Sequence, residues 1–204
     1  MPKVDLEKQR KKLDREITFF HFKKAQRLIT KCIKISEKYN DNFFFYYFTA
    51  QAYILKDKFD KAMIFLDKAL EVKGNDGCTY NDKGLCLAEL GRYNEALNCF
   101  NNGLEKDKTC VPLYHNKGWL LNLLGRHKDA ILCFHKSLEL DKARPESLFS
   151  MADSYRNMGR IDESIKYFRR TLKIIKGKSK YIYKETKRRL KELETTSEFP
   201  QTGS

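Results

Sequence analysis

The stretch GWLLNLLGRHKDAILCF, residues 118–134, decides the fold. Apolar residues recur at three- and four-residue intervals on either side of Gly125, and the series continues through Ile131, Phe134 and Leu138. This spacing is typical of amphipathic helices. Glycine tolerates the left-handed conformation that commonly ends a helix, so Gly125 predicts a tight turn between two helices.

The same helix–turn–helix pattern recurs with a period of 34 residues. Each copy has a small residue in its first helix, a breaker, a second small residue, and a large apolar residue one helical turn after the second small one. Across the four copies, the first small residue is Ala50, Gly84, Gly118 and Ala152, and the breaker is Asp57, Gly91, Gly125 and Gly159. The second small residue is Ala62, Ala96, Ala130 and Ser164, and the large apolar residue is Leu66, Phe100, Phe134 and Phe168. Pairing of small and large residues one turn apart predicts close helix packing.

This pattern resembles the tetratricopeptide repeat family, and the resemblance covers most of the chain. The third copy carries Tyr114, Gly118, Leu121, Ala130 and Phe134 at the family's motif positions. The family's closing proline is absent; those positions hold Gly74, Lys108, Lys142 and Lys176. The resemblance implies an all-α fold, a tetratricopeptide-type α-solenoid of stacked antiparallel helix pairs with a C-terminal capping helix.

The repeat register predicts the organisation of the chain. Residues 6–39 are expected to form a degenerate helix pair, because Phe22 and Ala25 reproduce the spacing of Phe59 and Ala62 from 37 residues upstream, with a short insertion at 40–42. Four full repeats should occupy 43–76, 77–110, 111–144 and 145–178. Residues 179–194 should form a basic capping helix, which stacked repeats need to cover their last apolar face, and 195–204 a disordered tail.

The net charge of +14 is concentrated at the two ends of the chain. Residues 1–39 carry a net +7, residues 40–165 a net −1 and residues 166–204 a net +8. Basic ends can attract a polyanion, an acidic protein or an anionic membrane surface, or they can simply be solvated. The sequence favours the solvated alternative.

No catalytic or metal-binding pattern is recognisable, so we expect no enzyme activity, cofactor or metal site. The six cysteines form no Cys-x-x-Cys pair and are expected to be reduced, buried thiols. No apolar run reaches the roughly 18 residues of a membrane span, and no secretory signal is visible. We therefore expect a cytoplasmic protein.

The first helix of each repeat has a packing stripe and, about 110° away at roughly 100° per residue, a second stripe. In proteins that this chain resembles, the second stripe lines a concave groove that holds a peptide segment of the partner. With flanking residues included, the resemblance gives these groove positions: Phe44, Tyr47, Gln51, Asn81, Asp82, Leu85, His115, Asn116, Trp119, Asn122, Phe149, Asp153 and Arg156.

These groove positions predict a peptide partner with an apolar anchor followed by polar groups. Asparagine suits such a site because its amide both donates and accepts hydrogen bonds. For the aromatic run 43–48, core packing is an equal alternative; for Trp119 a groove role is favoured. A heat-shock carboxylate clamp is not expected, because the positions of its Lys, Asn and Arg residues hold Tyr47, Gln51, Asp82, Pro112 and Asn116, none of which is a cation.

The alternative function is RNA or nucleoprotein association through the basic ends. Its candidate contacts are the cations of the capping helix, Lys184, Lys187, Arg188, Arg189 and Lys191, with residues 187–189 expected on the exposed side. Few aromatics interleave with these cations, although single-strand binders usually stack bases on aromatic rings. Protein binding through the groove is therefore the favoured function.

Overall fold

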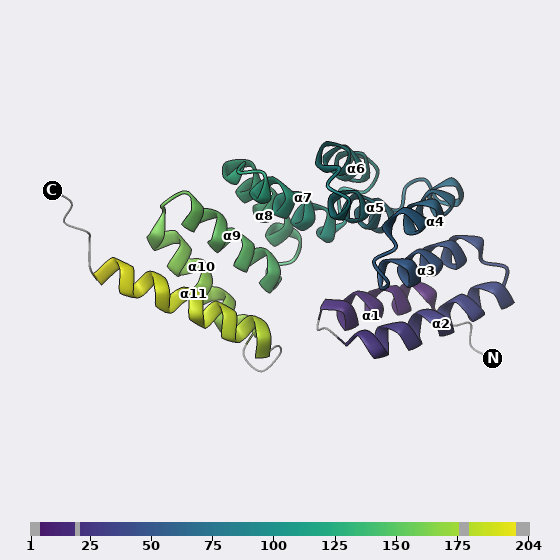
Figure 1. Ribbon diagram of the computed structural model, residues 1–204, viewed down its shortest axis with the longest axis horizontal. Coiled ribbons are helices and arrows are strands. Elements are labelled where there is room, and N and C mark those ends of the chain that lie inside the picture. The colour runs from purple at the N-terminus through teal and green to yellow at the C-terminus, as the bar shows by residue number, and fades with distance from the viewer. Residues whose placement is uncertain (1–4, 19–20, 176–179, 199–204) are drawn as a thin grey trace. The chain divides into compact units, whose positions relative to one another are not determined.

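The computed structural model describes residues 5–18, 21–175 and 180–198, and every regular element in these ranges is an α-helix. Figure 1 shows them in chain order. The helices are α1 (Leu6–Thr18), α2 (Phe22–Lys38), α3 (Asn42–Ile54), α4 (Phe59–Val72), α5 (Gly77–Glu89), α6 (Tyr93–Lys106), α7 (Val111–Leu123), α8 (His127–Leu140), α9 (Pro145–Asn157), α10 (Ile161–Ile175) and α11 (Lys180–Glu198). The predicted all-α fold class is confirmed.

The helices pack as antiparallel pairs of sequence neighbours within two compact units, residues 1–113 and 114–204. In the first unit α3 pairs with α4 and α5 with α6, and α2 and α4 each also pack on the helix that follows. In the second unit α9 pairs with α10, and α8 and α10 pack on α9 and α11. Within each unit, the helix that follows a pair therefore packs on that pair, as expected for stacked repeats.

The predicted packing register is confirmed. The side chains of Ala62, Ala96, Ala130 and Ser164 are fully buried, as are those of Leu66, Phe100, Phe134 and Phe168. A methyl group on Gly84 would overlap the ring of Phe100, and one on Gly118 would come within 2.8 Å of the Phe134 ring. These glycines are required because each large ring packs directly on the backbone of the paired helix.

The predicted breakers end the first helix of each pair. Gly91, Gly125 and Gly159 have φ of 73°, 75° and 73°, and Asp57 adopts the same left-handed conformation with φ of 54°. After each glycine, a backbone amide donates to a carbonyl in the last turn, as Arg126 N does to Leu121 O at 2.9 Å. This arrangement satisfies carbonyls that the helix end would otherwise leave unpaired.

Both ends of the repeat array differ in detail from the expectation. Asp41 caps α3 by accepting from the Phe44 amide at 3.1 Å, so Asn42 belongs to the helix and not to the insertion. The last helix continues to Glu198, so the tail predicted from residue 195 is wrong for its first four residues. Residues 199–204 lie outside the described residues. On α11, Thr186, Leu190 and Leu193 are buried, as a capping face requires.

None of the helices among the described residues has the length and apolar character needed to span a bilayer.

Candidate peptide-binding surface

Two hydrogen-bonded contacts join side chains of successive first helices, and each includes at least one predicted groove position. Within the first unit, Gln51 Nε2 of α3 donates to Asp82 Oδ2 of α5 at 2.5 Å. Within the second unit, His115 Nδ1 of α7 lies 3.1 Å from Ser147 Oγ of α9. We call the predicted groove positions together the first-helix row. Several of them bond one another, as Gln51 and Asn81 bond Asp82.

Asp82 is the centre of a polar cluster in the first unit. Asn81 Nδ2 donates to its Oδ1 at 3.1 Å, and the Tyr47 hydroxyl also hydrogen-bonds the carboxylate. Burial raises the pKa of Asp82 to about 6, although the hydrogen bonds from Asn81 and Tyr47 oppose that rise. Asp82 is thus a half-buried carboxylate whose oxygens are already hydrogen-bonded, and it is not an open contact point.

Helix α1 covers this cluster. The Arg10 guanidinium lies 5.2 Å from the centre of the Tyr47 ring and donates to the two carboxylate oxygens of Asp76 at 2.9 and 2.8 Å. Tyr47 and Gln51 each retain only 5% exposure, and Asn81 retains 6%. While α1 is docked these three side chains cannot contact a peptide, which corrects their assignment as free groove residues.

The aromatic run of α3 belongs largely to the core, one of the two alternatives that the sequence left open. Tyr47 and Phe48 join the core cluster that includes Leu13 and Ile29, and Phe48 is fully buried. Phe44 is partly buried against this cluster, with its ring centre 5.9 Å from that of Phe48. Leu85 of α5 is also only partly exposed.

In the second unit, two row residues are held by neighbouring side chains. The His115 ring lies 5.7 Å from the Phe134 ring, and burial, reinforced by Arg144, lowers the pKa of His115 to about 3, so the imidazole is neutral at physiological pH. Phe149 packs edge-on against Phe168 with ring centres 5.3 Å apart. Both side chains are fixed in place and keep part of their surface exposed.

Further along the same row, Asn116, Trp119 and Asn122 of α7 are partly exposed. The Asn122 side-chain oxygen lies 2.5 Å from His127 Nδ1, which fixes the orientation of its amide. Trp119 follows His115 by one helical turn on α7. Its position supports the predicted placement on the row and leaves part of the large side chain available for contact.

The row ends at a charged cluster beneath α11. Asp153 of α9 pairs with Arg156 at 3.4 Å and with Arg189 of α11 at 2.9 Å. Arg189 also pairs with Glu185 at 2.9 Å, and its side chain is only 22% exposed. Arg189 was expected on the exposed side of the cap, and the structure corrects that expectation: it fastens α11 to α9.

The other predicted polyanion contacts differ in whether carboxylates already bond them. Arg188 is 52% exposed and bonds Glu185 and Glu192 of its own helix, so its charge is largely matched. Lys184, Lys187 and Lys191 are exposed. Two of the five cations proposed for polyanion binding are therefore engaged with carboxylates.

Sequence reasoning missed Arg10 and Asp76, whose ion pair holds α1 over the row. One signal was present: Arg10 lies 37 residues before Tyr47, which is the offset of the degenerate first pair, and so falls on the same stripe. Its partner Asp76 precedes α5 and belongs to no stripe, because it is the capping residue whose carboxylate accepts from the Thr79 amide at 2.9 Å.

The cysteines contribute to packing. Cys32, Cys86, Cys99 and Cys110 are buried, and burial raises the pKa of the Cys32 thiol to about 11. Cys78 and Cys110 touch, with their sulfur atoms 3.9 Å apart. In the described part of the chain, no three His, Cys, Asp or Glu side chains gather at a spacing that could hold a metal ion.

Family models match the chain over two adjoining regions. The tetratricopeptide repeat model matches residues 111–144 and 145–177, and a model described as anaphase-promoting complex, cyclosome, subunit 3 matches residues 20–103. The chain is a tetratricopeptide repeat protein. Tetratricopeptide repeat domains mediate protein–protein interactions.

Solved tetratricopeptide repeat structures share the fold at low sequence identity. A thermophilic protein of Thermus thermophilus is 15% identical with a TM-score of 0.73, over 94% of this chain and all of that one. YrrB, described as having an unusual peptide-binding site, is 15% identical with a TM-score of 0.59, over 86% and 88% of the two chains. The first such domain of Spaghetti, bound to an HSP90 peptide, is 16% identical with a TM-score of 0.55, over 60% and 94%.

A curated relative is similar over a short segment only. Signal recognition particle subunit SRP72 of Dictyostelium discoideum is 40% identical over 48 residues, which are 24% of this chain and 7% of the relative. The match therefore spans a small fraction of that protein.

Proposed function

We propose that this protein is a non-catalytic scaffold or adaptor that binds a peptide segment of a partner protein on the α7–α9 part of the first-helix row. The observation that carries the proposal is the partly exposed Trp119, set on the same helix face as Asn116 and Asn122. Tryptophan is enriched among the residues that dominate binding energy, because it offers a large apolar area and one hydrogen-bond donor.

The chemistry of the row defines the peptide. The side chain of Trp119 provides the apolar contact, and the amide of Asn116 can pair with a peptide carbonyl or N–H group. His115 is neutral and the Asp153 charge is matched by Arg156 and Arg189, so this part of the row presents little net charge. The proposed ligand is an internal peptide segment with an apolar anchor flanked by polar groups.

A heat-shock carboxylate terminus does not fit the row in the first unit. Asp82 occupies the position of a clamp residue, its pKa of about 6 leaves it largely ionised at neutral pH, and it is already bonded to Gln51 and Asn81. A second carboxylate beside it would be repelled.

Capture of partners from native lysate tests the proposal with a matched pair of variants. The row variant carries Trp119→Ala and Asn116→Ala. The control carries Leu132→Ala and Lys136→Ala on α8, where Leu132 is 65% exposed. Loss of an anchor worth about 2 kcal/mol reduces affinity about thirtyfold, so the row variant should lose its principal partners while the control keeps them.

Both variants must melt close to the unaltered protein for that comparison to count. A large loss of stability in the row variant would mean that Trp119 serves core packing and not partner binding. Retention of every partner by a well-folded row variant would place the binding surface elsewhere on the molecule.

The alternative function, RNA association through the capping helix, is weakened by the ion pairs of Arg188 and Arg189. An arginine already bonded to carboxylates gains less from a phosphate group, because the existing pair must be disrupted. The exposed lysines of α1 and α2 form no ion pairs with carboxylates in the described part of the chain.

A further inference from the structure

Helices α1 and α2 carry an array of exposed cations, none of which forms an ion pair with a carboxylate in the described part of the chain. On each helix they fall within an arc of about 100°, so each set shares one face. We call this surface the α1–α2 basic face: Lys8, Lys11, Lys12, Arg15, Lys23, Lys24, Arg27, Lys31, Lys34 and Lys38.

The acidic side chains of α1 are used elsewhere. Glu7 pairs with Arg10 at 2.7 Å and with Lys73 at 3.5 Å. Glu16 pairs with His21 at 2.8 Å, and Asp14 acts on Asp82, whose pKa it helps to raise. Most of the negative charge of α1 is therefore directed away from the basic face, although Arg15 and Lys24 act on Glu16, whose pKa they help to lower.

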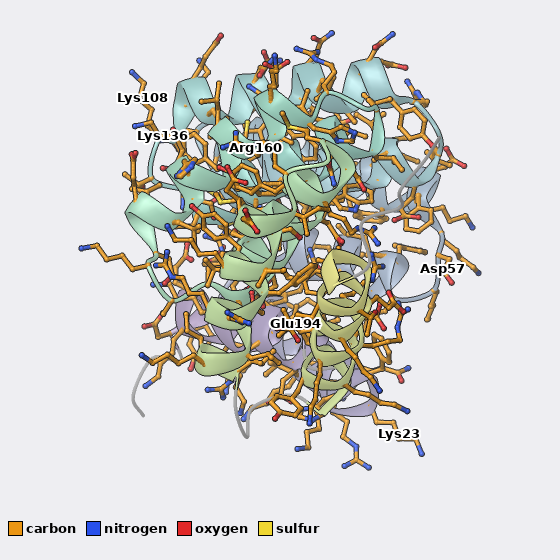
Figure 2. The ribbon with its side chains drawn as sticks, turned by 90° about the vertical axis from the view of Figure 1, so that its left-hand side faces the viewer. Lys23, Asp57, Lys108, Lys136, Arg160 and Glu194 are labelled. Atoms are coloured by element: carbon orange, nitrogen blue, oxygen red, sulfur yellow. The ribbon has the colours of Figure 1, made fainter. Side chains whose placement is uncertain are left out.

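The cations of the two helices lie close enough to act together. Lys12 of α1 and Lys31 of α2 both act on Cys32, whose pKa each of them lowers against the larger effect of burial. Figure 2 shows Lys23 projecting away from the ribbon. A polyanion resting on this surface would contact both helices and would displace counterions as it bound.

A lipid bilayer would use only the charge of this surface. An anionic bilayer attracts clustered cations, and an interfacial helix also inserts an apolar face between lipids. Here the apolar faces are inside the protein, because Leu6, Leu13, Ala25 and Ile29 are buried in the core of the first unit. A nucleic-acid duplex offers closely spaced phosphates and, in addition, sugar groups that can form hydrogen bonds.

Two shallow hollows on the basic face add neutral hydrogen-bonding groups. One is lined by Lys23, Gln26, Arg27 and Thr30 of α2. The other lies on α1 and is lined by Lys8, Gln9, Lys11, Lys12 and Arg15. Basic side chains beside amides and a hydroxyl are the groups that contact sugar and phosphate in nucleic-acid complexes.

We propose that the α1–α2 basic face binds the sugar–phosphate backbone of double-helical RNA without reading its bases. The exposed aromatics Phe22 and Tyr39 lie at the ends of α2 and not between the cations, so the face offers no stacking platform for single strands. Thr30 donates to the Gln26 carbonyl at 3.0 Å, which leaves its hydroxyl oxygen to accept from a 2′-hydroxyl group. Such a group is present in RNA and absent from DNA.

Binding is measured with a 20-base-pair RNA duplex, the DNA duplex of the same sequence, and one RNA strand alone. For six or more phosphate contacts, affinity for the RNA duplex should fall about a thousandfold between about 50 and 200 mM salt. The RNA duplex should bind more tightly than the other two probes. A Gln26→Ala and Thr30→Val variant should reduce the preference for RNA over DNA.

Charge reversals locate the surface. The test variant carries Lys11→Glu, Lys23→Glu and Arg27→Glu, and the matched control carries Lys184→Glu, Lys187→Glu and Lys191→Glu on α11. Both change the net charge equally. The test variant should lose at least tenfold in affinity, and its salt slope should be shallower by about three, whereas the control should stay within threefold of the unaltered protein.

Several outcomes would overturn the proposal: equal losses in the test and control variants, tighter binding of the single strand, equal binding of the DNA duplex, or binding to phosphatidylserine vesicles without binding to duplex RNA. Should the test variant fail to fold, the surface is located instead by measuring how strongly bound RNA protects each lysine of the unaltered protein from chemical acetylation. RNA must then protect Lys11 and Lys23 more than Lys184 and Lys187, and equal protection would contradict the assignment.

Discussion

Asp82 accepts hydrogen bonds in a half-buried position where no cation bonds it directly among the described residues. Its donors are the side chains of Tyr47, Gln51 and Asn81, while Arg10 acts from a greater distance. Hydrogen bonds stabilise the ionised form, but burial opposes them and is the larger effect. The folded protein therefore binds a proton at Asp82 more tightly than the unfolded chain does.

The tighter binding of a proton to Asp82 in the folded protein predicts a pH-dependent contribution to stability. The pKa of Asp82 rises from an ordinary value of 3.8 to about 6 on folding. A raised carboxyl pKa gives stability that is fully present below pH 3.8 and is lost as pH rises to about 6, with a slope of up to about 1.4 kcal/mol per pH unit. Denaturant unfolding of the unaltered protein and of Asp82→Asn, compared from about pH 4 to 7, should show this fall in the difference between them. A difference that does not vary with pH would contradict it.

The contact between Gly84 and the Phe100 ring predicts an intolerance to any side chain at Gly84. Overpacking costs about 1–3 kcal/mol, against about 1 kcal/mol of helix propensity that alanine contributes. Gly84→Ala should therefore lower the free energy of unfolding. Adding Phe100→Leu makes room for the methyl group, so the double variant should lose less than the sum of the two single changes. Additive losses would show that the two residues are not in contact.

At the scale of elements, ion pairs join α11 to its neighbours: Arg169 of α10 reaches Glu194, and one arginine of the adjacent pair 188–189 reaches α9. Arg189 reaches Asp153 on α9, whereas Arg188 bonds carboxylates of its own helix. Exposed pairs within one helix contribute little, since solvent screens them and the side chains lose freedom. The half-buried pair between helices should contribute more, because removing Arg189 leaves Asp153 with Arg156 alone.

We therefore expect Arg189→Ala to lower the free energy of unfolding by about 1–3 kcal/mol and Arg188→Ala by less than about 0.5 kcal/mol. The two variants remove the same side chain at neighbouring positions, so each controls for the other. Denaturant unfolding at moderate salt measures both. Equal effects would mean that the Arg189–Asp153 pair does not help to hold α11.

The sequence predicted the elements better than the contacts of the site. The 34-residue period fixed the small positions, the breakers and the large residues, because a helix pair can stack on its neighbour in one register only. The same arithmetic placed Tyr47, Gln51 and Asn81 on one face. It could not show that α1 covers them, since the Arg10–Asp76 pair joins residues 66 apart and lies outside the repeat period.

At the scale of the whole molecule, the first helix pair is joined to the repeats by more than stacking. Arg10 is 12% exposed at its side chain and Asp76 4%, so their ion pair is well shielded from solvent. The Asp76 carboxylate also accepts from the Thr79 amide and hydroxyl at the start of α5. The docking of α1 and the capping of α5 therefore depend on the same carboxylate, and they share its Oδ2 atom.

Arg10→Met keeps much of the apolar stem and removes the charge. We expect it to lower the free energy of unfolding by about 1–3 kcal/mol, because Asp76 would keep only Thr79 and the exposed Lys73 as partners. Arg15→Met, on the exposed side of the same helix, should change stability by less than about 0.5 kcal/mol. Equal melting of the two variants would contradict the role given to Arg10.

The double use of Asp76 sets a limit on modularity. Repeat arrays ordinarily lengthen and shorten by whole units, because each unit meets only its neighbours. Here, removing the first pair would take Arg10 away from Asp76 and open that carboxylate to water at the start of α5, two first helices further along the chain. Asp76 could still cap α5 through Thr79, because a hydrated aspartate is a favoured capping residue. The array is therefore not strictly modular at this end: a change in its first helix pair alters the charge environment of a helix two repeats away.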